Sequence, residues 1–121
     1  MKDERKYDLE SRTFLFAKSV RSFIKRVPMT LTNVDDCRQL GKASGSVGAN
    51  YIEANESISR KDFDYRIKIC RKEAKESTYF LRLIDISDRS ELQNEQNDLI
   101  QEASELTRIF GSIVSKRNRL I

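Results

Sequence analysis

The sequence contains no histidine and no tryptophan, and its 121 residues include only one proline, four glycines and two cysteines. Without histidine, imidazole general bases, Ser-His-Asp and Cys-His nucleophile systems, and His-ligated zinc or haem sites are excluded. The single proline, Pro28, and the scarcity of glycine disfavour a turn-rich β-sandwich. The two cysteines, Cys37 and Cys70, lie far apart in the sequence and are expected to be reduced thiols in a cytoplasm.

Long apolar segments are also missing. The longest uncharged run covers residues 43–52, well short of the roughly 18 residues that cross a bilayer. Residues 1–8 mix both signs of charge and contain no apolar signal-peptide core. We therefore expect a cytoplasmic protein with no membrane partner, in which residues 1–8 are a flexible lead within a single domain of residues 1–121.

Apolar residues recur at helical spacing along almost the whole chain. A first helix is expected over residues 9–27 and ends at Pro28, because proline cannot continue the backbone hydrogen-bond ladder. A second helix is expected to begin near Asn33 or Asp35, where negative charge favours a helix start.

A third helix is expected after the capping sequence Ser59-Arg60-Lys61-Asp62, and a polar break over residues 85–90 precedes a fourth. Four helices with short connections predict an all-α fold, an antiparallel up-down-up-down four-helix bundle.

Each predicted helix has one stripe that is expected to face the core. In an up-down bundle Cys37 and Cys70 would lie about 16 Å apart along the axis, too far for a disulfide. Both cysteines are therefore expected to fill the core. The four stripes are Leu9, Thr13, Phe16, Ala17, Val20, Ile24 and Val27; Cys37, Leu40, Ser44, Val47, Tyr51, Ala54 and Ile58; Phe63, Ile67, Cys70, Ala74, Ser77, Leu81 and Ile84; and Leu92, Leu99, Ala103, Leu106, Phe110, Ile113 and Val114.

Two of the helices carry a second face beside the core stripe. Three glycines within the second helix disfavour it by about 0.8–1 kcal/mol each relative to alanine, which indicates close packing either within one protomer or against another subunit. Aromatic residues off the stripe of the third helix form a patch typical of interfaces. We therefore expect a homo-oligomer, with the interface candidates Phe14, Gly41, Gly45, Gly48, Ile52, Tyr65, Ile69, Glu73, Glu76, Tyr79, Phe80 and Leu83.

An enzymatic interpretation would have to use the carboxylates Glu53, Glu73 and Glu76. Di-metal sites in four-helix bundles use Glu-x-x-His pairs, which this chain cannot supply. We therefore expect no catalytic residues, no metal and no cofactor, and ion pairing for these glutamates, including a pair between Lys42 and Glu76. Asn50, at the edge of its stripe, is expected to bridge two helices by hydrogen bonds.

Charge is unevenly distributed along the chain, whose net charge is +4. Residues 60–75 contain seven basic and three acidic side chains, residues 106–121 contain four basic and no acidic ones, and residues 88–105 contain six acidic and one basic. An up-down bundle brings the first two segments to one end. This basic end is either a solvated surface or a nucleic-acid site with the candidates Arg60, Lys61, Arg66, Lys68, Arg71, Lys72, Arg108, Lys116, Arg117 and Arg119.

A series of short motifs follows in order along the first three helices: Arg12-Thr-Phe-Leu-Phe-Ala17, Gln39-Leu-Gly-Lys-Ala-Ser44, Ser46-Val-Gly-Ala-Asn50, Glu53-Ala54, Asp62-Phe63 and Lys72-Glu73-Ala-Lys-Glu76-Ser-Thr-Tyr-Phe-Leu81. They resemble the four-helix-bundle family of proteins encoded in 23S rRNA intervening sequences. The resemblance implies an all-α protomer, a homopentameric ring and no known enzymatic activity. One branch is similar to the accessory variability determinant of diversity-generating retroelements, a basic pentamer that binds nucleic acid and a reverse transcriptase.

These observations predict a non-enzymatic, oligomeric binding or scaffold protein. Its expected ligand is nucleic acid, or a protein that handles nucleic acid, bound at the basic end. No base-reading motif is present, so binding is expected to be sequence-tolerant. The alternative is a structural protein–protein interaction module that does not bind nucleic acid.

Overall fold

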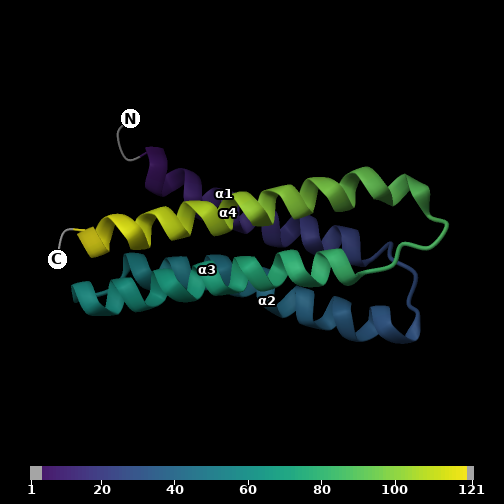
Figure 1. Ribbon diagram of the computed structural model, residues 1–121, viewed down its shortest axis with the longest axis horizontal. Coiled ribbons are helices and arrows are strands. Elements are labelled where there is room, and N and C mark those ends of the chain that lie inside the picture. Colours follow the sequence, from purple (N-terminus) through teal and green to yellow (C-terminus); the bar gives the residue numbers. More distant parts are fainter. Residues whose placement is uncertain (1–3, 120–121) are drawn as a thin grey trace.

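The computed structural model describes the backbone of residues 4–119 and the side chains of residues 9–116. Its helices are α1 (Glu4–Ile24), α2 (Leu31–Asn55), α3 (Arg60–Leu83) and α4 (Gln93–Arg119), with a short 3-10 helix, η1 (Ser90–Leu92), directly before α4. Consecutive helices pack antiparallel against each other, and α1 closes the bundle against α4 (Figure 1). The predicted four-helix bundle is confirmed.

The helix ends follow local capping chemistry. α2 begins at Leu31, earlier than predicted, because the side-chain oxygen of Thr30 accepts a hydrogen bond from the Asn33 N–H at 3.2 Å. α3 begins where predicted, since Ser59 Oγ accepts a hydrogen bond from the Asp62 N–H at 3.0 Å. A helix start is therefore fixed by a hydroxyl cap at each of these two positions.

α1 differs from its prediction at both ends. It begins at Glu4, inside the segment that was expected to be a flexible lead, and it ends at Ile24 instead of Val27. Before Pro28 the backbone tightens into a turn in which the Val27 N–H donates to the Ile24 carbonyl at 3.2 Å. The effect of proline thus reaches back over the whole preceding turn.

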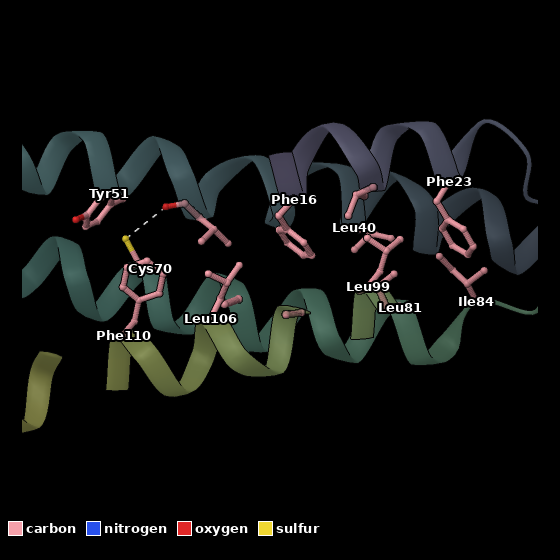
Figure 2. Close-up of a cluster of buried hydrophobic side chains, with 14 of the residues drawn as sticks. Phe16, Phe23, Leu40, Tyr51, Cys70, Leu81, Ile84, Leu99, Leu106 and Phe110 are labelled. Carbon is pink, nitrogen blue, oxygen red and sulfur yellow. Dashed lines mark hydrogen bonds between the residues drawn. The ribbon is translucent and has the colours of Figure 1, made fainter. Parts of the chain in front are cut away.

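The core consists mainly of the predicted stripes and runs the length of the bundle (Figure 2). The Tyr51 and Phe110 rings pack in a tilted arrangement with centroids 5.7 Å apart. Phe23, which lies outside the predicted stripe, is fully buried. Ile58, predicted to face inward, is 99% exposed because α2 ends before it and it lies in the connection to α3.

Both cysteines are free and buried, as predicted. The Cys70 thiol donates a hydrogen bond to the Val47 carbonyl at 3.4 Å, drawn as the dashed line in Figure 2. Burial raises the pKa of Cys70 to about 12. Because the thiolate is the reactive species, this side chain is inert at neutral pH.

Buried amides fix the end of the bundle that contains the α1–α2 and α3–α4 connections. Asn33 is fully buried, and its Nδ2 donates to the Pro28 carbonyl at 2.8 Å and to the Asp85 carbonyl at 2.7 Å. Its Oδ1 accepts from the Asp85 N–H at 3.0 Å. Gln96 Nε2 similarly donates to the Leu81 and Ile84 carbonyls at 2.8 and 3.0 Å. The opposite end, where α3 begins and α4 finishes, holds the basic segments (Figure 1).

Candidate nucleic-acid interface

Two adjoining hollows lie between α3 and α4. The larger, of about 610 Å³, is lined by Arg71, Arg108, Gly111, Ser112, Val114, Ser115 and Lys116. The second, of about 390 Å³, is lined by Lys75, Thr78, Tyr79, Arg82, Ser104, Thr107 and Arg108. Because Arg108 lines both, the hollows adjoin at this side chain, and together they are called the basic groove.

Helical spacing explains why these side chains gather. On α3 the lining residues Arg71, Lys75, Thr78 and Arg82 follow an i, i+4, i+7, i+11 pattern, which places them on one face. On α4 the same pattern places Ser104, Arg108, Gly111 and Ser115 opposite them. Small α4 residues leave room for long α3 cations: a Cβ on Gly111 would lie 3.5 Å from Nε of Arg71.

The basic groove is positively charged throughout. Its lining includes five cations and no carboxylate, and within residues 9–116 none of the five forms a side-chain hydrogen bond or ion pair: Arg71, Lys75, Arg82, Arg108 and Lys116. Hydroxyl groups from serine and threonine lie among them. A concave surface with like charges raises the local concentration of the opposite ion. The groove therefore has the chemistry to hold a polyanion.

The predicted nucleic-acid candidates separate into four groups. Arg71, Arg108 and Lys116 meet in the basic groove. Arg60, Lys61 and Lys68 are exposed but do not line it. Arg117 and Arg119 lie outside the residues whose side chains the structure describes.

The remaining two candidates interact with other residues. Arg66 Nη1 donates to Asn50 Oδ1 at 3.1 Å, which confirms the predicted bridge from Asn50 to a second helix. Lys72 Nζ lies 3.5 Å from a carboxylate oxygen of Glu73. Lys75 and Arg82 were not among the predicted candidates, although their helical spacing from Arg71 could have identified them.

The other flank of α4, which faces α1, is ion-paired. Arg12 binds Glu102 at 2.7 Å and Glu105 at 2.6 Å, and Arg26 lies 2.5 Å from Glu95. Hydrogen bonds from Gln101 and then Arg12 hold the pKa of Glu105 below its ordinary value. Much of the predicted acidic segment is thus neutralised within the protomer.

The three interface-candidate glycines of α2 have different surroundings. A Cβ on Gly48 would lie 2.9 Å from Oγ1 of Thr13, so close packing of α1 within the protomer accounts for this glycine. A Cβ on Gly45 would lie 3.1 Å from the Arg21 guanidinium, whereas one on Gly41 meets nothing within 4 Å. Of the two interpretations left open by the sequence, the intramolecular one therefore explains Gly48.

The other interface candidates lie on two surfaces. Phe14 and Gly45 line a hollow of about 300 Å³ between α1 and α2, together with Ala17, Lys18 and Arg21. The interface candidates on α3 are not fully buried. Three are half-buried, Ile69, Glu73 and Phe80, and four are exposed, Tyr65, Glu76, Tyr79 and Leu83. Of these, Tyr79 lines the basic groove. Ile52 of α2 is also exposed.

The carboxylates singled out from the sequence have ordinary surroundings. The predicted ion pair between Lys42 and Glu76 does not form; in the described part of the chain Glu73 pairs with Lys72 instead. Among residues 9–116, no cluster of three acidic or cysteine side chains is placed to hold a metal ion. None of the described helices has the length and apolar character needed to traverse a bilayer.

Comparison with known proteins identifies a family and solved structures that resemble this chain. The crystal structure of a protein of unknown function from the S23 ribosomal protein family of Bacteroides thetaiotaomicron is 25% identical, with a TM-score of 0.71 over 87% of this chain and 96% of that one. No curated protein matches the chain. The model of the 23S rRNA-intervening sequence proteins matches residues 5–112. The protein therefore belongs to the family of 23S rRNA-intervening sequence proteins.

Proposed function

We propose that this protein is a non-enzymatic, oligomeric binding module of the cytoplasm that holds nucleic acid by its phosphate backbone along the basic groove. The observation that carries the proposal is the groove itself, where five cations lie together without a carboxylate or an internal ion pair in the described part of the chain. The lack of histidine supports a binding role, because the commonest general acid-base side chain is absent.

The length of the groove suits a run of phosphates. Gly111 of α4 lies beside Arg71 of α3, and from this level the groove extends in both directions. It extends eleven residues along α3 to Arg82 in one direction and five residues along α4 to Lys116 in the other. At ~1.5 Å per residue this is about 24 Å. Phosphates of a stacked strand follow one another every ~3.4 Å along the helix axis and lie further apart in an extended strand, so at most about seven would fit beside the cations. Such contacts position a backbone without reading its sequence.

Salt dependence of binding tests this proposal. We expect the affinity for a fluorescein-labelled RNA to fall steeply between about 50 and 200 mM salt, because each phosphate contact releases counterions. Replacing one groove cation, Arg108→Gln, should weaken binding. It should also reduce the slope of log affinity against log salt concentration by about one. The matched control is Lys25→Gln, which removes an exposed cation that does not line the groove. Absence of binding at the lowest salt, or an equal effect from both variants, would contradict the proposal.

Self-association through the surface between α1 and α2 completes the proposal. Phe14, which lines the hollow at Gly45, is 61% exposed, and Ile52, seven residues or about two helical turns after Gly45 on α2, is 56% exposed. Apolar patches of this kind usually mark interfaces, and the family resemblance noted from the sequence implies a pentamer. Light scattering should report a homo-oligomer that Phe14→Glu dissociates, whereas Ile58→Glu, an exposed apolar residue outside this surface, leaves it intact. A wild-type monomer at micromolar concentration would refute the assembly.

A second candidate function is a protein–protein interaction module without nucleic acid. It is favoured by Tyr65 and Leu83, exposed side chains of α3 that do not line the basic groove. A polypeptide bound there should show little salt dependence and no response to Arg108→Gln. These two readouts separate the two functions.

A further inference from the structure

Tyr79 is the single aromatic side chain among the residues that line the basic groove. It is 60% exposed, and its ring packs edge-to-face with Phe80, with centroids 5.2 Å apart and an angle of 79° between the planes. In such a pair the edge of one ring meets the face of the other, so Phe80 covers at most one face of Tyr79. The contact orients the ring and leaves a π-face available.

Cations surround this ring. Lys75 and Arg82 lie one helical turn before and one after Tyr79 on α3, and Arg108 lines the same hollow from α4. A base stacked on Tyr79 would therefore have cations on both sides for the phosphates that flank it. A stacking surface within a positively charged groove is the usual construction of sites for single-stranded nucleic acid.

A duplex would use this arrangement poorly. Its bases are stacked on one another and offer only their edges in the grooves, so the face of Tyr79 gains nothing from them. A single strand, by contrast, can present the face of a base to an aromatic side chain.

We propose that the ligand of the basic groove is single-stranded nucleic acid, with one base stacked on Tyr79 and the neighbouring phosphates bound by Lys75, Arg82 and Arg108. This inference depends on the proposed nucleic-acid binding and makes it more specific. It also assigns Tyr79, a candidate for the subunit interface on sequence grounds, to ligand binding, so that self-association uses the surface between α1 and α2.

Fluorescence anisotropy at fixed low salt with three probes tests the inference. The probes are a single-stranded RNA of about 12 nucleotides, within the site sizes of about 4–16 nucleotides known for single-strand-binding folds, the DNA of the same sequence, and the RNA annealed to its complement. We expect the single strands to bind more tightly than the duplex. Tyr79→Ala should weaken single-strand binding by about 5- to 150-fold, the range measured for loss of one stacked base.

Four variants separate stacking from other effects. Tyr79→Phe keeps the ring and should stay within about twofold of wild type, whereas Tyr79→Leu keeps an apolar contact with Phe80 and should behave like Tyr79→Ala. Tyr65→Ala is the matched control, because Tyr65 is 59% exposed on the same helix outside the groove. Circular dichroism of each variant should match wild type, since both tyrosines are exposed.

The possible failures are distinguishable. If wild type binds no probe at low salt, the proposed function itself is wrong. If wild type binds but Tyr79→Ala affects duplex and single strands equally, or affects neither, or if the duplex binds more tightly, nucleic-acid binding stands and the stacking site is refuted.

Discussion

The two flanks of α4 have opposite electrostatic arrangements. Toward α1, α4 presents Glu95, Glu102 and Glu105; the last two pair with Arg12 of α1, and Glu95 pairs with Arg26 in the turn that follows α1. Toward α3 it presents Ser104, Thr107 and Gly111, which offer no counter-charge to the α3 cations. One helix therefore forms a neutralised seam on one side and a positively charged groove on the other, where Arg108 has a coulombic interaction with Glu105 but forms no ion pair among the described residues.

The difference shows where charge serves the fold and where it is available for a ligand. Part-buried arginine–carboxylate pairs hold α1 against α4. The unpaired cations of the basic groove repel one another and contribute nothing comparable to stability. The flank that is electrostatically unfavourable in the free protein is thus the one that gains most from an anionic partner.

The largest expected effect comes from reversing charge within the groove. The double variant Arg71→Glu with Arg108→Glu should weaken RNA binding by roughly 100-fold or more, because a hydrogen bond to a charged group contributes about 1.5–3 kcal/mol. Lys25→Glu with Lys42→Glu gives the same net charge on surfaces outside the groove and should have little effect. Equal losses in the two double variants would show that net charge, not the groove, governs binding.

On the opposite flank, removal of Arg12 should mainly affect stability. Arg12→Met breaks the bonds to Glu102 and Glu105 and leaves two carboxylates close together. We expect the free energy of unfolding in urea to fall by about 1–2 kcal/mol, after allowing for partial exposure of the pair. Arg71→Met should change it by less than about 0.5 kcal/mol. A similar loss in both variants would abolish the distinction between the flanks.

Thr107→Glu would add a carboxylate to the flank of α4 that faces α3, so that this flank would resemble the one that faces α1. A carboxylate in this lining position lies among Lys75, Arg82 and Arg108. We expect RNA affinity to fall about tenfold, equivalent to ~1.4 kcal/mol, and stability to stay equal or rise by up to about 1 kcal/mol. Thr107→Gln controls for side-chain size and should retain most of the affinity. Unaltered binding by Thr107→Glu would place the ligand elsewhere.

Acid should weaken the ion-paired flank slightly. The pKa of Glu105 is lowered in the folded protein, by hydrogen bonds from Gln101 and then Arg12. The contribution of Glu105 to the free energy of unfolding is therefore present above the ordinary carboxyl pKa of 4.5. It is lost as the pH falls through the lower pKa that Glu105 has in the folded protein. As the pH falls below 4.5, the urea concentration at the unfolding midpoint should decrease less for Arg12→Met than for wild type. Arg71→Met serves as the comparison. The same drop in all three proteins would exclude this origin.

Helical periodicity was sufficient to predict the fold because most core residues lie on one stripe per helix. The first and last residues of the helices were harder to predict, because local capping and turn chemistry, and not apolar periodicity, determine them. Thr30 starts α2 before the acidic residues that suggested its start, and the turn before Pro28 ends α1 at Ile24. Asn33 and Gln96 were not predicted to be buried, because their partners are backbone groups brought close only by tertiary packing.

The candidate site was predicted in part for a related reason. Counting charge by segment located the basic end, but it could not show which side of α3 faces α4. Arg66 points to Asn50 and Lys72 pairs with Glu73, whereas Lys75 and Arg82 turn to the groove. The sequence likewise could not show which glycine of α2 packs against a neighbouring helix, because only the position of Thr13 distinguishes Gly48 from Gly41.

The amide of Asn33 also sets an order of events during synthesis of the chain. It bonds to Asp85, which is 52 positions later and leaves the ribosome correspondingly later. Until then the Pro28 carbonyl is the one partner of this amide in the first hairpin, and its Oδ1 must stay in contact with water, since burying that oxygen without a donor is unfavourable. The first half of the bundle is therefore completed only when the second half arrives, and a chain interrupted before residue 85 would remain a substrate for chaperones and proteases.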